Sequence, residues 1–183
     1  MNLPMKHLFA LSLVVFVAIG CGSDSKPTSE TAAMAGKIQV MEDSLFNSTQ
    51  YDQRKAQALL DVYKAYATTY PLDSMAPEFL FRAAGLAKSM RDPHQSVFLY
   101  DRIATDYPSW YRLADVYYLK AFTIDSDQDR MGEARAAYEE VIKRYPDHPF
   151  AKDAKAMIEN LQYTDEELIE RFQAMQDSAQ ATN

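Results

Sequence analysis

Three segments of the chain end on the same dipeptide, Tyr-Pro, at nearly fixed spacing. The prolines are Pro71, Pro108 and Pro146, so successive copies lie 37 and 38 residues apart. The segments 92–108 and 131–146 match each other best, because Tyr, an aliphatic residue, Tyr and Pro recur at the same places in both. The copy that ends at Pro71 is looser. A fixed period of this length indicates an internal structural repeat.

Each copy has the spacing of an amphipathic helix. In the second copy the apolar residues fall at three- and four-residue steps; they are Val97, Tyr100, Ile103, Ala104 and Tyr107. Proline has no N–H to donate and disfavours α geometry in the residue before it, so each helix should end at its Tyr-Pro. Small residues upstream favour a second, closely packed helix; the inner positions are Leu80, Ala83, Ala84 and Ala87. The sequence therefore predicts antiparallel helix pairs and an all-α fold.

This pattern resembles the tetratricopeptide repeat (TPR) family, in which aromatic, small and proline residues recur at fixed positions of a helix pair. The second copy has fitting residues at these positions: Leu80, Ala84, Ser96, Tyr100, Ile103 and Pro108. The third copy has Tyr118, Phe122 (or Ala121 with a one-residue slip), Ala134, Tyr138, Val141 and Pro146. The first copy has only Leu59, Tyr63, Tyr66 and Pro71. The resemblance implies a short α-solenoid of stacked helix pairs; the alternative is a plain helical bundle.

Residues 1–20 have the pattern of a signal peptide. Lys6 and His7 precede an apolar run of about a dozen residues, whereas a helix that spans a membrane needs about 20. Cys21, the only cysteine in the chain, follows directly. This resembles a bacterial lipoprotein signal, in which the cysteine is lipidated and becomes the mature N-terminus, although Ala18 stands where that family usually has Leu. The alternative is ordinary secretion with an unpaired thiol.

The rest of the chain divides into three parts. Residues 21–36 are rich in Ser, Thr and Asp and are predicted to be a flexible tether. Residues 37–162 are the predicted repeat domain. Residues 163–183 begin with a capping-box sequence at 164–167 and are predicted to form a helix that caps the final repeat, followed by a frayed tail. The apolar stripe of that helix consists of Leu168, Ile169, Phe172 and Met175.

The chain is acidic, with 26 Asp and Glu residues against 19 Lys and Arg residues and a net charge of −7. This balance argues against nucleic acid as a partner and against direct adhesion to anionic headgroups. Attachment to a membrane should therefore come from lipid on Cys21, since each buried methylene of an acyl chain contributes about 0.8 kcal/mol.

The sequence carries no motif for catalysis: no nucleophile elbow, zinc-protease helix or phosphate loop. Asp125, Asp127 and Asp129 alternate as the ligands of a calcium loop do, but the Gly and Glu that such a loop also needs are missing. His94 and His148 have no second ligand at metal spacing. We therefore expect a protein that is not an enzyme and has neither metal nor cofactor.

In TPR proteins the first helix of each pair lines a concave groove that takes extended or helical segments of a partner protein. The resemblance implies such a groove here, with Phe81, Trp110 and Leu119 as apolar anchors and Lys88 and Arg112 for an acidic peptide end. The other expected groove positions are Glu78, Gly85 and Ser89, then Val116, Thr123, Ser126 and Asp127 or one residue earlier. For Phe81 the alternative is packing in the core.

Three tripeptides, at 43–45, 73–75 and 177–179, resemble the Asp-Ser/Thr-aliphatic sequon of a periplasmic O-glycosylation system in some Gram-negative bacteria. The candidate modification sites are Ser74 and Ser178, because both lie in segments expected to be exposed. Motifs of three residues also arise by chance, which is the alternative.

The Tyr-Pro ends and the run 145–154 resemble envelope proteins of the BamD and YbgF/CpoB type over about residues 59–161. This implies a non-catalytic scaffold for an envelope protein or peptide, lipid-anchored to the outer membrane on its periplasmic or surface face, with a role in outer-membrane assembly or maintenance. One alternative is a self-associating structural subunit whose groove is filled by its own C-terminal helix or by a second copy. Another is an accessory subunit of an envelope enzyme or transporter.

Overall fold

The computed structural model describes residues 29–126, 130–163 and 165–181. Eight helices account for most of these residues, and no strand occurs among them. The helices are α1 (Ser29–Phe46), α2 (Gln53–Thr69), α3 (Ala76–Ser89), α4 (Pro93–Asp106), α5 (Leu113–Asp125), α6 (Met131–Arg144), α7 (Pro149–Asn160) and α8 (Asp165–Ala181).

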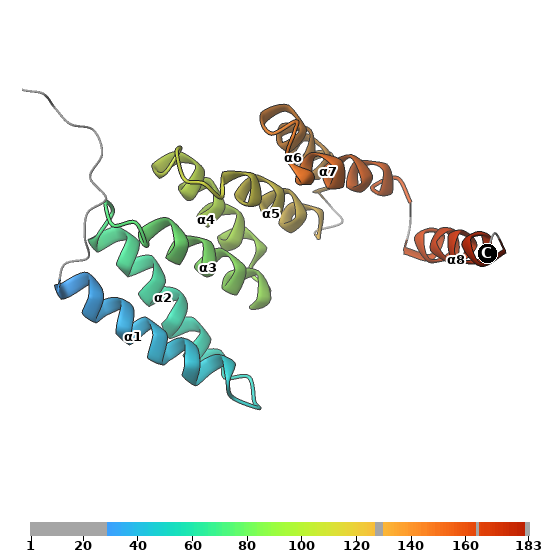
Figure 1. Ribbon diagram of the computed structural model, residues 1–183. Helices are drawn as coiled ribbons and strands as arrows, with labels where there is room; N and C mark the ends of the chain where they lie inside the picture. The colour runs from blue at the N-terminus through green and yellow to red at the C-terminus, as the bar shows by residue number, and fades with distance from the viewer. Residues whose placement is uncertain (1–28, 127–129, 164, 182–183) are drawn as a thin grey trace, which may run out of the picture.

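Helices α1 to α7 stack in chain order, each packed against the next, and α5 also contacts α7 (Figure 1). Side-chain contacts join alternate helices: Arg82 on α3 reaches Glu42 on α1, and Arg102 on α4 reaches Thr68 on α2. The odd-numbered helices thus line one face and the even-numbered helices the other. The fold is a TPR-like all-α solenoid, as predicted.

The three Tyr-Pro helix ends have almost the same geometry, which confirms the predicted repeat. The C-cap residues have φ/ψ of −126°/60°, −130°/57° and −131°/55°; they are Tyr70, Tyr107 and Tyr145. In each turn the N–H of the residue three positions on donates to the carbonyl of that tyrosine; the donors are Asp73, Trp110 and His148. A common turn gives each following helix a common direction.

Small residues let the helices approach one another closely. On α3 the inward positions Ala83, Ala84 and Ala87 are fully buried, and the large side chains that fill the space around them come from α2 and α4. The last pairs have a smaller core of their own, built from Ala121, Tyr138, Val141 and Ala154. These are the inner positions that the TPR resemblance implied, with the one-residue slip in α5.

The burial of Ala121 and Phe122 decides between the two possible registers of α5. Ala121 is 0% exposed and Phe122 is 41% exposed, so the alanine takes the small inner position and the phenylalanine faces out. Val116 and Thr123, which the unslipped register placed in the groove, are buried. The groove assignment for these two residues was therefore wrong, and burial favours the register one residue earlier, in which Phe122 is exposed.

The predicted tether is too long. Helix α1 already begins at Ser29, and Thr31 and Ile38 are buried, so the segment 29–36 is helix and part of the folded domain. Cys21 and the rest of residues 1–28 lie outside the described residues. Among the described helices none is long and apolar enough to cross a membrane.

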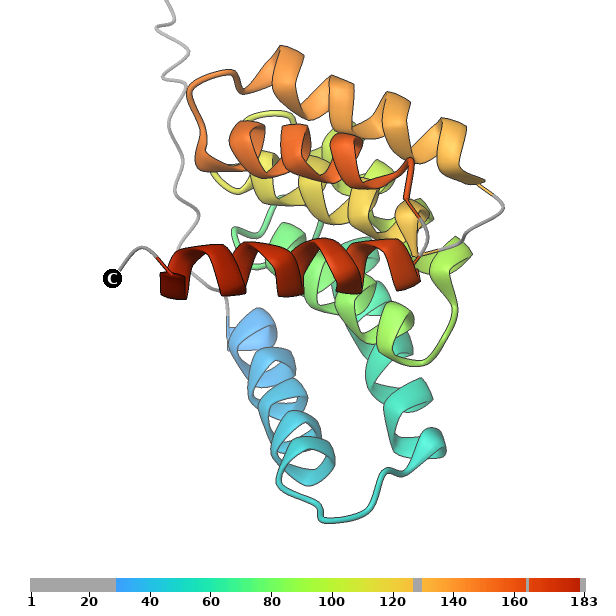
Figure 2. The same ribbon diagram turned by 90° about the vertical axis from the view of Figure 1, so that its right-hand side faces the viewer.

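The predicted helix forms as α8 and continues to Ala181 instead of fraying earlier, but its predicted role as a cap is wrong because α8 contributes no residue to either core. Its apolar side chains Ile169, Phe172 and Met175 are exposed. In Figure 1 α8 stands apart from the stack, whereas in the turned view of Figure 2 it crosses in front of the other helices. Thr164, part of the predicted capping box, lies outside the described residues. The stack therefore ends at α7.

Helix α7 has the two-sided character that a terminal helix needs. Its buried side carries Ala151 and Ala154. Its other side carries exposed Lys152, Lys155 and Glu159. The residues 38 positions earlier, in α5, are Ala114, Tyr117 and Ala121, of which Ala114 and Ala121 are buried. Charged residues at these positions keep a further helix from packing there, so α7 is the cap.

Candidate functional site

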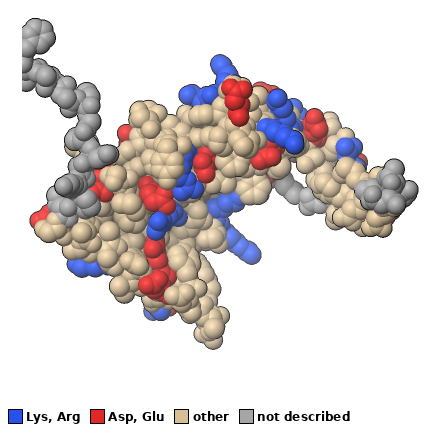
Figure 3. All heavy atoms as spheres, viewed as in Figure 1, with Lys and Arg blue, Asp and Glu red and all other residues tan. Residues whose placement is uncertain are grey.

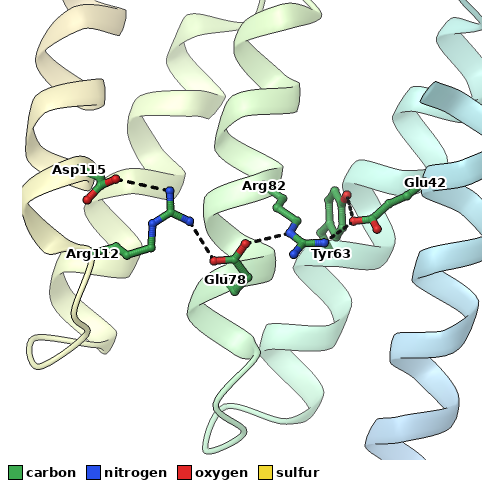
Figure 4. A network of polar contacts seen from close by, with 6 residues as sticks. All are labelled: Glu42, Tyr63, Glu78, Arg82, Arg112 and Asp115. Atoms are coloured by element: carbon green, nitrogen blue, oxygen red, sulfur yellow. Dashed lines mark hydrogen bonds and ion pairs between the residues drawn. The ribbon is translucent and has the colours of Figure 1, made fainter. Parts of the chain in front are cut away.

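A row of ion pairs, which we call the ladder, crosses the face of the odd-numbered helices (Figure 4). Arg82 on α3 donates to Glu42 on α1 over 2.8 Å and to Glu78 on its own helix over 2.9 Å. Arg112, just before α5, donates to Glu78 over 3.1 Å and to Asp115 over 3.4 Å. In Figure 3 acidic and basic side chains alternate in a band down this face.

The ladder is a set of fixed charges. Burial alone would lower the pKa of Arg82, but its hydrogen bonds to Glu42 and Glu78 outweigh that effect and raise it. Tyr63 donates to Glu42 over 2.6 Å; burial first, and this hydrogen bond second, raise the pKa of Tyr63 well above its usual range. Glu42 and Glu78 are both paired with guanidinium groups. The ladder therefore joins α1, α3 and α5 to one another and offers no unpaired carboxylate of these two residues to a partner.

Three of the five predicted groove residues, Phe81, Trp110 and Arg112, lie together in one packed cluster. The Phe81 ring lies 5.7 Å from the ring of Trp110 and 5.9 Å from that of Tyr100, centroid to centroid. The guanidinium carbon of Arg112 lies 4.0 Å from the centroid of Phe81. Arg112 is also paired in the ladder, where its Nη1 donates to Glu78 and its Nη2 to Asp115. Phe81 therefore packs against the core, as its alternative stated.

The other two predicted anchors lie elsewhere. Leu119 packs, partly buried, against the main core. Lys88 places its Nζ 3.6 Å from the ring centroid of Phe122, and burial lowers its pKa although Asp125 acts to raise it. No carboxylate of the described residues forms an ion pair with Lys88. This ammonium is thus partly desolvated and suited to a carboxylate from outside.

Two hollows flank these residues along the odd-numbered helices. One, of about 440 Å³, is lined by Glu42, Phe46, Tyr63, Arg82, Gly85, Leu86 and Ser89. The other, of about 670 Å³, is lined by Phe122, Asp125, Ser126, Met131, Met157, Asn160, Leu161, Tyr163, Glu166 and Leu168. Phe46 is 64% exposed beside the first hollow, and a Cβ added at Gly85 would meet nothing within 4 Å. Each hollow thus has one exposed phenylalanine in its lining, Phe46 in the first and Phe122 in the second.

Sequence reasoning missed Phe46 and the outward side of Phe122. Phe46 stands at the end of α1, whose pattern did not fit a repeat. Phe122 was given an inner position unless the register slipped by one residue to Ala121. The signal for Phe122 was the adjacent Ala121, which fits a small inner position better.

The candidate glycosylation sites are both exposed, and nothing in the structure tests their modification. Ser74 lies in the turn between α2 and α3. Ser178 lies on α8 and donates to the carbonyl of Met175 over 2.9 Å. An intact-mass measurement on native protein tests the prediction.

The calcium-like segment is only partly described. Asp125 accepts a hydrogen bond from Tyr138 over 3.0 Å, while Asp127 and Asp129 lie outside the described residues. In the part of the chain that the structure describes, no group of three or more His, Cys, Asp or Glu side chains could hold a metal ion.

Comparison with known families agrees with the fold. Residues 109–148, which contain α5 and α6, match the family described as Tetratricopeptide repeat. No curated protein matches the chain. The molecule thus contains a TPR-type repeat within a TPR-like solenoid, and this kind of module typically binds other proteins without catalysis.

Proposed function

We propose that this chain is a lipid-anchored, non-catalytic scaffold of the bacterial cell envelope that binds a segment of a partner protein along its odd-numbered helices. The sequence pattern around Cys21 supports the anchor, and the TPR-type repeat supports a protein partner. The resemblance to the BamD and YbgF/CpoB type supports a role in outer-membrane assembly or maintenance.

The observation that carries the binding site is the exposed apolar strip beside the ladder. Phe46 and Phe122 are solvent-exposed on α1 and α5, and Gly85 between them leaves open space on α3. A partner helix or extended segment can place apolar side chains in the two hollows. A carboxylate of the partner then meets Lys88. The ladder fixes the spacing of α1, α3 and α5 beneath that segment.

A single bulky residue tests this site without removing a core contact. We expect Gly85→Trp to fill the first hollow and to abolish crosslinking of one defined envelope protein in pull-downs from native membranes. Gly36→Trp is the matched control, because Gly36 is also helical, has open space at its Cβ and lines neither hollow. Circular dichroism shows whether both variants keep the wild-type fold. The same partners recovered with both variants would place binding elsewhere.

The anchor is tested separately. Cys21→Ser should move the protein from the membrane fraction to the soluble fraction, since no other lipid attachment site is proposed. Wild-type protein found in the soluble fraction would overturn the lipid anchor and leave the binding face untouched. The proteins that co-purify with the wild type distinguish a scaffold from an accessory subunit of an enzyme or transporter.

One observation favours self-association as a second candidate function. Helix α8 exposes an apolar stripe that no core of the chain uses, formed by Ile169, Phe172 and Met175. If a second copy covers this stripe, Phe172→Glu should convert a dimer into a monomer in light scattering. Gln173→Glu, exposed on the same helix, is the control. A wild-type protein that is monomeric at high concentration removes this candidate.

A further inference from the structure

A third hollow surface lies between two of the Tyr-Pro turns. We call it the turn cleft. It has a volume of about 490 Å³ and is formed by the turn from α2 to α3 and the turn from α4 to α5. Its lining consists of Pro71, Leu72, Asp73, Ser74, Pro77, Asp106, Tyr107, Pro108, Ser109, Trp110 and Tyr111.

The walls of the turn cleft are rigid. Both turns share the backbone hydrogen bonds of the repeat, and three prolines fix φ along the walls. Asp73 also accepts from the N–H of Met75 over 2.8 Å, which locks the first turn. A surface built in this way exists before a ligand arrives, so little ordering entropy opposes binding.

Aromatic rings form one side of the cleft. Trp110 lies edge-to-face between Phe81 and Tyr111, with centroid distances of 5.7 Å to each. Tyr111 is 84% exposed, so its ring face is available to a ligand. Within the described part of the chain, no acceptor takes the indole N–H of Trp110, and that nitrogen is not among the buried unsatisfied groups. The cleft therefore combines flat apolar surface with a hydrogen-bond donor that is open to a ligand.

We propose that the turn cleft binds a proline-rich segment in the polyproline II conformation with a basic residue next to the prolines. A polyproline II helix makes no internal hydrogen bonds, so its carbonyls can accept from Trp110. Pyrrolidine rings pack on aromatic faces, and aromatic-lined grooves take such segments. The only charged residues in the lining are Asp73 and Asp106. Asp106 pairs with Arg102 through Oδ2 over 3.2 Å, which leaves its Oδ1 outside that pair, so a Lys or Arg of the ligand still meets carboxylate oxygens of both residues.

Other occupants fit this cleft less well. An acidic segment would meet the two carboxylates. An added β-strand needs the free edge of a sheet, and the described residues contain no strand. The turn cleft shares no lining residue with either hollow of the odd-numbered helices. Its test is therefore independent of the test of the function proposed above.

Trp110 gives a direct readout, because it is the only tryptophan in the chain. Purified protein, shown by intact mass to be unmodified, is titrated with two synthetic peptides, six prolines followed or preceded by one arginine. We expect a saturable change in tryptophan fluorescence with a Kd below about 1 mM for at least one of them. A peptide with alanine in place of proline should give no saturable change.

Variants then locate the site. Tyr111→Ala should raise the Kd at least fivefold, whereas Tyr51→Ala, an exposed tyrosine outside the cleft, should leave it unchanged. Asp106→Asn should reduce the preference for the arginine-containing peptide over six prolines alone. The proposal is overturned if neither proline peptide binds, if the alanine peptide binds equally well, or if Tyr111→Ala and Tyr51→Ala behave alike.

Discussion

Arg112 donates from Nη1 to Oε2 of Glu78 over 3.1 Å, which joins the residue before α5 to the first turn of α3. The other oxygen of Glu78 accepts from Arg82, so one carboxylate holds two guanidinium groups. The side chain of Glu78 is 19% exposed, and solvent screens this contact less than it screens a surface pair. Glu78 is therefore the central residue of the ladder.

We expect Glu78→Ala to lower the free energy of unfolding by about 2 kcal/mol, because two partly buried guanidinium groups lose a charged acceptor. Glu140→Ala is the matched control: Glu140 pairs with Arg144 one turn away, and both side chains are more exposed. The loss of this exposed ion pair should lower the free energy of unfolding by no more than about 0.5 kcal/mol. Urea denaturation followed by circular dichroism measures both, and equal losses would contradict the central role of Glu78.

Gly85 offers a stabilising substitution at the proposed binding face. It lies inside α3, and a Cβ there would meet nothing within 4 Å. Gly85→Ala should therefore raise the free energy of unfolding by about 0.5–1 kcal/mol, since alanine loses less backbone entropy in a helix. Thermal denaturation measures the change. Gly132→Ala, in the first turn of α6, should give a smaller gain, and a loss of stability at Gly85 would mean that the open space is needed for folding.

The turns and inner positions could be predicted from the sequence because they depend on local chemistry. A proline directly after the last turn ends the helix at the residue before it, and the three C-cap tyrosines share one conformation as a result. The register of α5 could not be fixed, because most positions in its sequence are apolar or aromatic and the pattern has no clear period. Burial of Ala121 decided it.

The ladder could not be predicted because its partners are distant in sequence. Glu42 and Arg82 are 40 residues apart, and Arg112 and Glu78 are 34 apart. Nothing in the local pattern of either residue shows which charge will face it. The role of α7 has a signal in the sequence that the predicted cap at 163–183 overlooked. Its Lys152, Lys155 and Glu159 replace Ala114, Tyr117 and Ala121 of α5, and a polar outer face marks the end of a repeat stack.

Stability should fall at high pH because buried tyrosines resist ionisation. Burial raises the pKa of Tyr66 and of Tyr100 to about 12, and burial with the negative charge of Asp125 raises that of Tyr138 further. The unfolded chain loses these protons near pH 10, so it binds fewer protons than the folded chain above that pH. The stability that these buried tyrosines contribute is therefore fully present below pH 10. It is lost as the pH rises toward their pKa values in the folded chain.

We expect the free energy of unfolding to fall by about 1.4 kcal/mol per pH unit for each such tyrosine between pH 10 and 11.5. Urea denaturation at several pH values measures the slope. Tyr138→Phe removes one of these groups and should make the slope less steep. A stability that does not change over this range, or an unchanged slope in the variant, would contradict the assignment.

Helix α8 should be dispensable for the stability of the solenoid, because α7 already closes it. No residue of α8 belongs to either core, and the exposed face of α7 carries Lys152, Lys155 and Glu159. A chain that ends at Tyr163 should therefore unfold within about 0.5 kcal/mol of the full chain. Ala154→Asp is the contrasting change, since it places a charge in the small core and should cost several kcal/mol. Urea denaturation at low protein concentration separates this result from any effect of α8 on self-association. A truncated chain that loses more than about 2 kcal/mol would mean that α8 packs against the stack in solution, with α7 only the penultimate layer.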